Sequence, residues 1–474
     1  MVDLGDHDVR DAVAARLGAP LAGRPVILGP GVLSGYTRPV RWLAALGCPV
    51  LILATDRDAG PVPAPEEYRL TRIAAPPTGS ITDEFRVLDK MVRHLPPGAV
   101  ADIEAFDPGR RGIFWGGPFV TSDEPILART VLGGRPRGFL ELEDKLLAEE
   151  IWVAAGVPVA PHRVVPVESA ALAAASDELA TELGVVWSGD ARDGFNGGGN
   201  YVRWILDDDD RPSALGFFLP RCDRVRVMPF LEGVPCSIHG FVMPGGTAVL
   251  RPVEIATLRN AHERRLVYGG LSSWWDPEPA DREEMRDVAR RVGEQLRSAY
   301  SYRGAFGIDG VMTADGFRPT ELNPRLPAGL NVAGGVDLRL LSLLQVSLLA
   351  DLDTGLGVED VESLLPLLDQ HREGRPLAVA TSRTLDVAEE FPVSVTLAGD
   401  SAVGRIDRAS TDTGDRLGLS QTPAGFFAQL DLCTAMVPGA RLAPLNVALM
   451  DFLDREYDAG FGVLTAARDV RAPH

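Results

Sequence analysis

Lysine is almost absent from this chain of 474 residues. Of its 47 cationic residues, only Lys90 and Lys145 are lysines, and arginine supplies the others. Acidic residues number 66, so the formal net charge is −19 and the pI is near 4.9. A surface so short of positive charge disfavours binding to nucleic acid or to anionic membranes, because both need clustered cations. We therefore expect small molecules, peptides or other proteins as partners.

Cysteine is also scarce. Cys48, Cys222, Cys236 and Cys433 are far apart and form no CxxC pair, so the sequence predicts buried thiols and no zinc or redox site. The N-terminus, MVDLGDHDVRD, lacks an apolar signal core, and no uninterrupted apolar run is long enough to span a bilayer. These features predict a cytoplasmic protein without a membrane segment.

Several common catalytic motifs are missing. Neither lysine follows a glycine, so the chain has no Walker A loop, and the kinase VAIK and HRD elements and the GxSxG elbow are absent as well. The segment GPGVLSG does not meet the GxGxxG spacing, which disfavours a dinucleotide site. Any ATP site would therefore have to be of another type.

The length suggests roughly three domains. The apolar runs RPVILG (24–29) and PVLILA (49–54) flank a helical stretch, which predicts a βαβ unit within an α/β domain over residues 1–135. The link VLGGRPRG, rich in glycine and proline, separates this domain from a second one over residues 136–371.

The second domain is expected to be α+β, with a lid subdomain at about 157–230. Its last strands are GAFGIDGVM and FRPTELN, which we expect to pair as a hairpin through TADG. Beyond residue 372, short strands and a late helix predict a small C-terminal domain over 372–474.

Polar residues alternate in PTELNPRLPAG (319–329). In a strand, Glu321, Asn323 and Arg325 would point to one face, and Asp309, twelve positions before Glu321, would lie opposite them on the preceding strand. Two carboxylates and an amide oxygen are ligands that suit Mg²⁺ on nucleotide phosphates, and an arginine fork suits a phosphate oxygen or an oxyanion. The plain alternative is the solvated face of an edge strand whose acids are balanced by arginine.

These residues resemble the ATP-grasp carboxylate-amine ligases. In that family, the last strands of the nucleotide domain carry an acid and then an E-x-N-P-R-like segment, and Asp309, Glu321, Asn323 and Arg325 match it position by position. The resemblance implies an ATP-grasp fold behind an α/β domain, with ATP and Mg²⁺ as cofactors. It implies metal ligation by the two acids and the asparagine, and a catalytic role for Arg325.

Further motifs resemble the family's ATP-binding segments. EDKLLAEEIWVAAGVPVAP carries a lysine before a helix, DGFNGGGN resembles the glycine-rich lid over the phosphates, and RVMPFLEGV resembles the adenine-binding connector. In the connector, a backbone carbonyl and an N–H would meet adenine, and an acid would approach the ribose. An exposed cation, a surface hairpin and core residues are the plain alternatives. The implied ATP-binding residues are Lys145, Gly197, Gly198, Gly199, Met228, Leu231 and Glu232.

Two features depart from the family pattern. A second phosphate-binding lysine usually stands before the lid, where GVVWSGD offers Trp187 or Ser188. Either Arg192 replaces it, or backbone N–H groups and magnesium hold the phosphates. The acid that often follows the hinge glycine is displaced by VPCS, which leaves the ribose contact open.

The acceptor site is expected around RPVEIATLR. Arg251 could dock a substrate carboxylate and stabilise an oxyanion, with Glu254 beside it, although an Arg–Glu pair that only ties strands together fits equally. With the lid and YGGLSSWWDP, this segment resembles, more narrowly, the pheganomycin-type peptide ligases.

The resemblance implies an ADP-forming ligase. A substrate carboxylate would attack the γ-phosphate of ATP, and an amine would capture the acyl phosphate to form an amide. In the peptide-ligase subgroup the acid is a small amino acid derivative, and the amine belongs to a peptide of a natural-product pathway. A small-molecule kinase of the same fold and a non-catalytic nucleotide-binding protein remain open, as does a homodimer.

Overall fold

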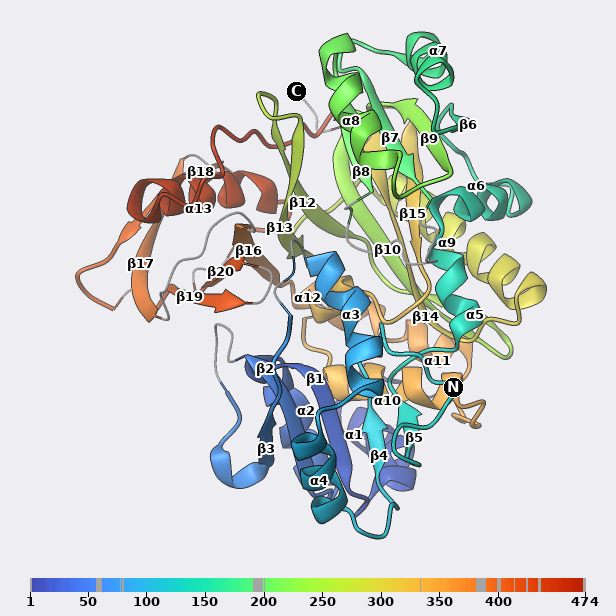
Figure 1. Ribbon diagram of the computed structural model, residues 1–474, viewed down its shortest axis with the longest axis vertical. Coiled ribbons are helices and arrows are strands. Elements are labelled where there is room, and N and C mark those ends of the chain that lie inside the picture. Colours follow the sequence, from blue (N-terminus) through green and yellow to red (C-terminus); the bar gives the residue numbers. More distant parts are fainter. Residues whose placement is uncertain are drawn as a thin grey trace.

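The computed structural model describes residues 2–56, 62–76, 78, 81–190, 199, 201–332, 334–380, 389–398, 402–412, 414–422, 425–433 and 436–471. Within these residues the strands form three sheets, of five, four and eleven strands. In Figure 1 the five-stranded sheet lies at the bottom and the four-stranded sheet at the top, with the long sheet between them.

The N-terminal sheet is parallel, with the order β3-β2-β1-β4-β5. The predicted βαβ unit is confirmed, because β1 and β2 pair in parallel on either side of α2. Both strands are almost wholly buried, which explains their continuous apolar sequence. The elements of this part are α1 (His7–Gly18), β1 (Val26–Val32), α2 (Thr37–Ala45), β2 (Val50–Asp56), β3 (Arg69–Arg72), α3 (Ile81–Arg93), α4 (Pro97–Phe106), β4 (Ile113–Trp115) and β5 (Thr130–Leu132).

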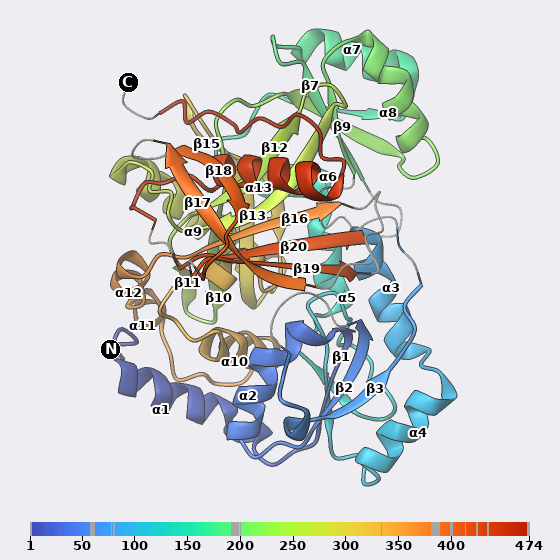
Figure 2. The same ribbon diagram turned by 90° about the vertical axis from the view of Figure 1, so that its left-hand side faces the viewer.

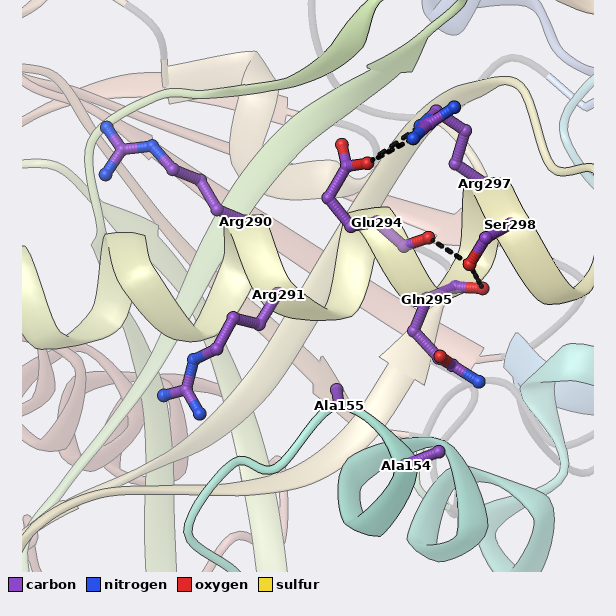
Figure 3. A pocket seen from close by; sticks show the side chains of 8 residues that line it. All are labelled: Ala154, Ala155, Arg290, Arg291, Glu294, Gln295, Arg297 and Ser298. Carbon is purple, nitrogen blue, oxygen red and sulfur yellow. Dashed lines mark hydrogen bonds and ion pairs between the residues drawn. The ribbon is translucent and has the colours of Figure 1, made fainter.

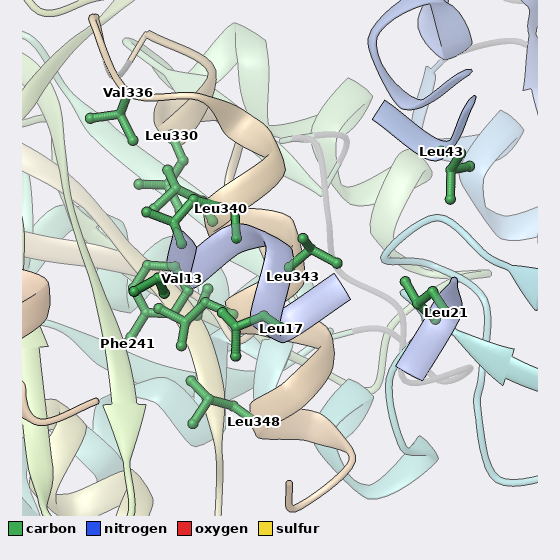
Figure 4. Packing of buried hydrophobic residues seen from close by; sticks show 14 of the residues in the cluster. Val13, Leu17, Leu21, Leu43, Phe241, Leu330, Val336, Leu340, Leu343 and Leu348 are labelled. Carbon is green, nitrogen blue, oxygen red and sulfur yellow. The ribbon is translucent and has the colours of Figure 1, made fainter. Parts of the chain in front are cut away.

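A shared apolar core joins the N-terminal part to the rest of the chain. Val13 and Leu17 of α1 pack with Leu340 and Leu343 of α10 (Leu338–Leu349), and Phe241 of the long sheet belongs to the same cluster (Figure 4). Since burial of apolar surface is the main stabilising contribution, this cluster holds the parallel sheet firmly beneath the long one.

The four-stranded sheet is antiparallel, with the order β6-β9-β7-β8. Two helices pack on it, around a core that contains Trp187 and Phe218. Its elements are β6 (Arg163–Pro166), α7 (Ser169–Leu179), β7 (Val185–Gly189), β8 (Val202–Ile205), α8 (Arg211–Phe218) and β9 (Arg224–Pro229).

The long sheet has the order β15-β14-β10-β12-β13-β16-β20-β19-β17-β18, with β11 beside β10. Residues 230–233 connect β9 of the four-stranded sheet directly to β10 of this one. The helices α6 and α9 cover one face of its first strands around Trp152 and Phe306. The elements of this region are α5 (Arg137–Leu140), α6 (Lys145–Ala154), β10 (Val234–Met243), β11 (Gly246–Val249), β12 (Val253–Asn260), β13 (Arg265–Ser272), α9 (Pro279–Ala299), β14 (Gly304–Thr313) and β15 (Gly316–Asn323).

The long sheet continues across residue 371. β13 pairs with β16 at Gly270 and Pro376, and Figure 2 shows the last strands beside α13, above the parallel sheet. The domain division at residue 371 stays a prediction, although the hydrogen-bonded ladder runs through it. The elements here are α11 (Val358–Glu362), α12 (Leu365–Gln370), β16 (Gly374–Ala380), β17 (Glu389–Ala398), β18 (Ala402–Arg408), β19 (Arg416–Thr422), β20 (Gly425–Asp431) and α13 (Leu442–Tyr457).

In the described part of the chain, no helix combines the length and the apolar character that a bilayer crossing requires.

Glu254 anchors α13 to β12. Its fully buried carboxylate accepts hydrogen bonds from Arg441 Nε at 2.8 Å and from the backbone N–H groups of Leu442 and Ala443 at 2.6 and 3.3 Å. A carboxylate at a helix N-terminus also interacts favourably with the helix dipole.

We expect Glu254→Gln to lower the free energy of unfolding by roughly 2–4 kcal/mol, because it leaves Arg441 without its buried counter-charge. Urea titration followed by tryptophan fluorescence measures the change. Glu456→Gln, an exposed position on the same helix, is the control and should stay within about 0.5 kcal/mol of wild type. Equal stability of the two variants would contradict the anchoring role.

Candidate functional site

The hairpin of β14 and β15 places Asp309 directly opposite Glu321. The strands pair through the turn at residues 313–316, as expected, and opposite residues of paired strands share one face of a sheet. Asn323 follows Glu321 by two positions and lies on the same face, where its Nδ2 donates to Asp309 Oδ2 at 2.9 Å. The predicted convergence of these three side chains is therefore present.

Cations lie against this set. Lys145 Nζ is 2.9 Å from Glu321 Oε2, and Arg325 Nη2 donates to Asn323 Oδ1 at 2.6 Å. Lys145 is the first residue of α6, which the Asp144 side chain caps by accepting from the backbone N–H of Leu146 at 2.7 Å. Because Lys145 is only 2% exposed, its ammonium group is directed into the site rather than into solvent.

Arg325 is held by a buried pair that the sequence analysis missed. Glu143 Oε1 accepts from Arg325 Nε at 2.7 Å and from Arg135 Nη1 at 2.9 Å, and Arg325 also lies over the Phe119 ring at 4.9 Å. Burial alone would raise the pKa of Glu143, but the two arginines bring it below the ordinary value. Arg135 stands in the Gly/Pro link, where only the tertiary contact reveals its role.

Asp309 is crowded by like charge. Burial, and then the nearby Glu321 carboxylate, raise the pKa of Asp309, although hydrogen bonds from Ser237 and Asn323 work in the opposite direction. Ser237 Oγ donates to Asp309 Oδ1 at 2.6 Å and lies 2.9 Å from His239 Nε2. The alternation of Ser237 and His239 on an otherwise apolar strand was the sequence signal that could have identified them.

The donor set fits a hard divalent cation. Two carboxylates that face each other in a partly buried setting repel, and a cation between them would remove that repulsion. Asn323 adds a carboxamide oxygen, now bonded to Arg325. In the part of the chain that is described, no three His, Cys, Asp or Glu side chains cluster as a metal site, so the fit rests on two acids and an amide.

The predicted adenine connector is the link between two sheets. Met228 lies in β9, opposite Val186 of β7, while Leu231 and Glu232 lie in the 230–233 link. Glu232 is engaged by both Nη atoms of Arg259, at 2.7 and 3.1 Å, and these hydrogen bonds lower its pKa although burial opposes them. A ribose would therefore have to compete with Arg259 for this acid.

The predicted lid is described only in part. Arg192, Gly197 and Gly198 lie outside the described residues, whereas Gly199 is exposed, with a φ of 73° that favours glycine. Of the two positions expected to replace a second lysine, Ser188 lies opposite Arg226 of β9, whereas Trp187 is buried in the core of the four-stranded sheet. The buried Arg226 pairs with Glu149 and donates from Nη2 to the carbonyl oxygen of Thr320, next to Glu321, at 2.9 Å.

Arg251 and Glu254 are not brought together. Arg251 donates to Asp369 Oδ1 at 3.1 Å and to Asp276 Oδ1 at 3.4 Å, while Glu254 holds the start of α13. These contacts favour the reading in which both residues tie elements together. Arg251 is 5% exposed, and burial, with the neighbouring Arg372, lowers its pKa to about 10.

A surface groove lies at the far end of α6. It has a volume of about 360 Å³ and lies between Ala154 at the end of α6, the following residue Ala155 and the arginine-rich face of α9 (Figure 3). The arginines are paired, for example Arg291 with Asp287 at 2.8 Å and Arg297 with Glu294 at 2.7 Å. The groove is open and away from the acids of β14 and β15.

Comparison with family models and with curated proteins finds no match to this chain. Solved structures do resemble it. A pyruvate carboxylase from Rhizobium etli is 16% identical, with a TM-score of 0.51 over 94% of this chain and 40% of that one. A carboxyaminoimidazole ribonucleotide synthase from Aspergillus clavatus, complexed with ATP, is 13% identical, with a TM-score of 0.47 over 91% and 98% of the two chains. An L-amino acid ligase from Bacillus licheniformis is 12% identical, with a TM-score of 0.48 over 86% and 92%.

The chain has the ATP-grasp fold. The mixed α/β architecture, with a parallel N-terminal sheet and two antiparallel sheets joined by the 230–233 link, confirms the predicted fold class. At these identities the likeness shows the fold alone.

The crowding of Asp309 predicts a pH-dependent stability. Its pKa is raised from 3.8 to about 6, so between these values the folded state holds a proton that the unfolded state releases, and this group's stabilisation is lost as the pH rises through about 6. In metal-free buffer, the Tm of Asp309→Asn relative to wild type should therefore be higher at about pH 8 than at about pH 5.5. Differential scanning calorimetry measures both, with Asp315→Asn in the β14–β15 turn as control. A Tm difference for Asp309→Asn that is independent of pH would contradict the crowding.

Proposed function

We propose that this protein binds Mg²⁺-ATP between the four-stranded and the long sheet and uses it to join a carboxylate to an amine. The observation that supports this most directly is the placement of Asp309 and Glu321 opposite each other on one face of the ATP-grasp sheet, with Lys145 and Arg325 against them. A metal-bound polyphosphate presents both positive and negative charge. It therefore suits a site in which acidic and cationic side chains lie together.

Asp309, Glu321 and Asn323 would hold the magnesium. When bound, it would neutralise phosphate oxygens and help to align the γ-phosphate with the attacking carboxylate. The residues of the chain would do the positioning, since phosphoryl transfer needs no protein nucleophile.

When nucleotide binds, the ammonium group of Lys145 would leave Glu321 and pair with a phosphate oxygen. A compact charge on a flexible side chain can change partners in this way. We assign the role of the missing second lysine to Arg226, because it lies opposite Ser188 and reaches the backbone next to Glu321. Arg192 stays a second candidate for that role. The backbone carbonyl of Met228, near the end of β9, and the N–H of Leu231, in the 230–233 link, would meet adenine, and Gly197, Gly198 and Gly199 would close over the phosphates.

Arg325 would stabilise the oxyanion that forms when an amine attacks the acyl phosphate. Its guanidinium group is already oriented, because Nε donates to Glu143 and Nη2 donates to Asn323. Little reorganisation would therefore be needed when the oxyanion forms. Arg251 stays a weaker candidate for carboxylate docking, because Asp276 and Asp369 share its guanidinium.

The narrower assignment is a peptide ligase of natural-product biosynthesis. It is supported by RPVE, by the lid sequence and by YGGLSSWWDP, which resemble the pheganomycin-type ligases. The acid would be a small amino acid derivative, and the amine would be a peptide N-terminus. A cytoplasmic location and a homodimer belong to the same proposal.

An ADP-release screen over pairs of amino acids and peptides, followed by mass spectrometry, tests the function. We expect ADP only when acid and amine are both present, and a product whose mass equals the two substrates less one water. Glu321→Gln should lower kcat by about 100-fold or more, because it removes a charge from the proposed metal site, while Asp315→Asn should not. A phosphorylated product from a single substrate would instead identify a kinase, and the absence of ADP release with every pair would contradict catalysis.

We expect Arg325→Lys to lower kcat about 10- to 100-fold, because one ammonium group cannot reproduce the two hydrogen bonds of the fork in the same geometry. Its KM for ATP should change less than kcat, since the oxyanion forms only after phosphoryl transfer. Steady-state kinetics separate the two effects. Arg318→Lys, on the same strand, where Nη1 donates to the carbonyl oxygen of Phe317, is the matched control, and equal loss of kcat in both variants would contradict the role.

A further inference from the structure

A short chain of buried polar side chains lies behind Asp309. Ser237, which pairs with Asp309 in the ladder of β10 and β14, donates to its Oδ1 at 2.6 Å. His239, two residues further along β10 and on the same face, has its Nε2 2.9 Å from Ser237 Oγ. Ser237 is 1% and His239 is 2% exposed, so neither is placed to meet a substrate in solution.

We propose that Ser237 and His239 are positioning residues, which fix the rotamer of Asp309 so that its Oδ2 edge is presented to the divalent cation. The inference rests on the proposed function, because it assigns the cation to Asp309. It adds two residues that touch neither nucleotide nor substrate and act only through this carboxylate.

The direction of the hydrogen bonds follows from proton counting. A serine hydroxyl has one proton, and the short bond to the carboxylate uses it, with only a longer contact of 3.2 Å to the carbonyl oxygen of Ile308. Nε2 of His239 must then carry the proton and donate to Ser237. Burial lowers the pKa of His239 to about 3, so the ring is neutral and its other nitrogen, Nδ1, is an acceptor.

The surroundings of the ring offer a matching donor. His239 and Arg251 line one cavity of about 10 Å³, which is close to the smallest volume that holds a single water. Among the described residues, Arg251 Nε has no hydrogen-bond partner. One water molecule there can link this donor to an accepting Nδ1.

Two glycines allow the backbone to pack closely against the imidazole. A Cβ on Gly329 would lie 2.0 Å from His239 Cε1, and a Cβ on Gly307 would lie 3.1 Å from its Cδ2. Gly329 ends the segment PTELNPRLPAG, so the loop that follows Arg325 packs directly against the ring. The segment that carries Glu321 and Asn323 thereby also fixes the support of Asp309.

The other oxygen of Asp309 also has a hydrogen-bond donor. Asn323 Nδ2 holds Oδ2 at 2.9 Å, so the carboxylate has one donor on each oxygen. Without the serine hydroxyl, Oδ1 would lose its donor and the carboxylate could rotate about its χ2 torsion. Loss of such a partner behind a metal ligand typically lowers metal affinity by about 10- to 100-fold.

The test compares Ser237→Ala with Ser237→Thr, which restores a hydroxyl. Electron paramagnetic resonance of Mn²⁺ in the presence of ADP measures cation affinity directly, and ADP binding without metal is measured by calorimetry. We expect Ser237→Ala to weaken Mn²⁺ binding about 10-fold or more, with metal-free ADP affinity changed less than about 3-fold, and Ser237→Thr to recover most of the loss. Ser347→Ala, another buried serine, is the control.

His239 provides an independent pair of variants. His239→Gln keeps an N–H donor near the Nε2 position and should retain more Mn²⁺ affinity than His239→Leu. Unchanged Mn²⁺ affinity in Ser237→Ala, or equal losses in the glutamine and leucine variants, would overturn the proposal while wild-type binding upholds the proposed function. Absence of Mn²⁺-ADP binding in wild type would overturn both.

Discussion

Asp309 and Glu321 face each other across β14 and β15, and their mutual repulsion is the constraint around which the site is built. The negative charge of each acid is partly offset by neighbouring side chains. Lys145 pairs with Glu321, and hydrogen bonds from Ser237 and Asn323 hold Asp309. The remaining excess of negative charge is what a divalent cation would neutralise. Because these groups come from α6, β10 and the β14–β15 hairpin, the site exists only once the long sheet and the helix are assembled.

The distribution of cations follows the physical difference between lysine and arginine. Arg325, Arg135 and Arg259 each use the planar fork to hold one or two acceptors in a fixed direction, as the bonds of Arg325 to Glu143 and Asn323 show. Lys145 is one of two lysines and lies buried beside Glu321. A compact charge on a flexible stem can change partners with little rearrangement, which suits a group that would exchange a carboxylate for a phosphate.

Much of the fold could be predicted because periodicity and register are local properties. The buried runs at 24–29 and 49–54 indicate a parallel βαβ unit, and the turn TADG predicts that Asp309 lies opposite Glu321, as the structure shows. Charged side chains were harder to interpret. Glu254 and Glu232 resembled ligand contacts in the sequence, yet Arg441 and Arg259 occupy them in the structure. A sequence does not show which distant cation will reach an acid.

By itself, the sequence determined which residues share a strand face, because side chains alternate with a fixed period and the hairpin turn sets the register. That was enough to bring Asp309, Glu321 and Asn323 together. Only the tertiary structure decided that Glu143 accepts from both Arg325 and Arg135, that Arg226 reaches the backbone next to Glu321, and that Ser237 and His239 lie behind Asp309. These contacts join segments far apart in the chain, and their partners are selected by packing and by the need to satisfy buried charge, neither of which is a local property.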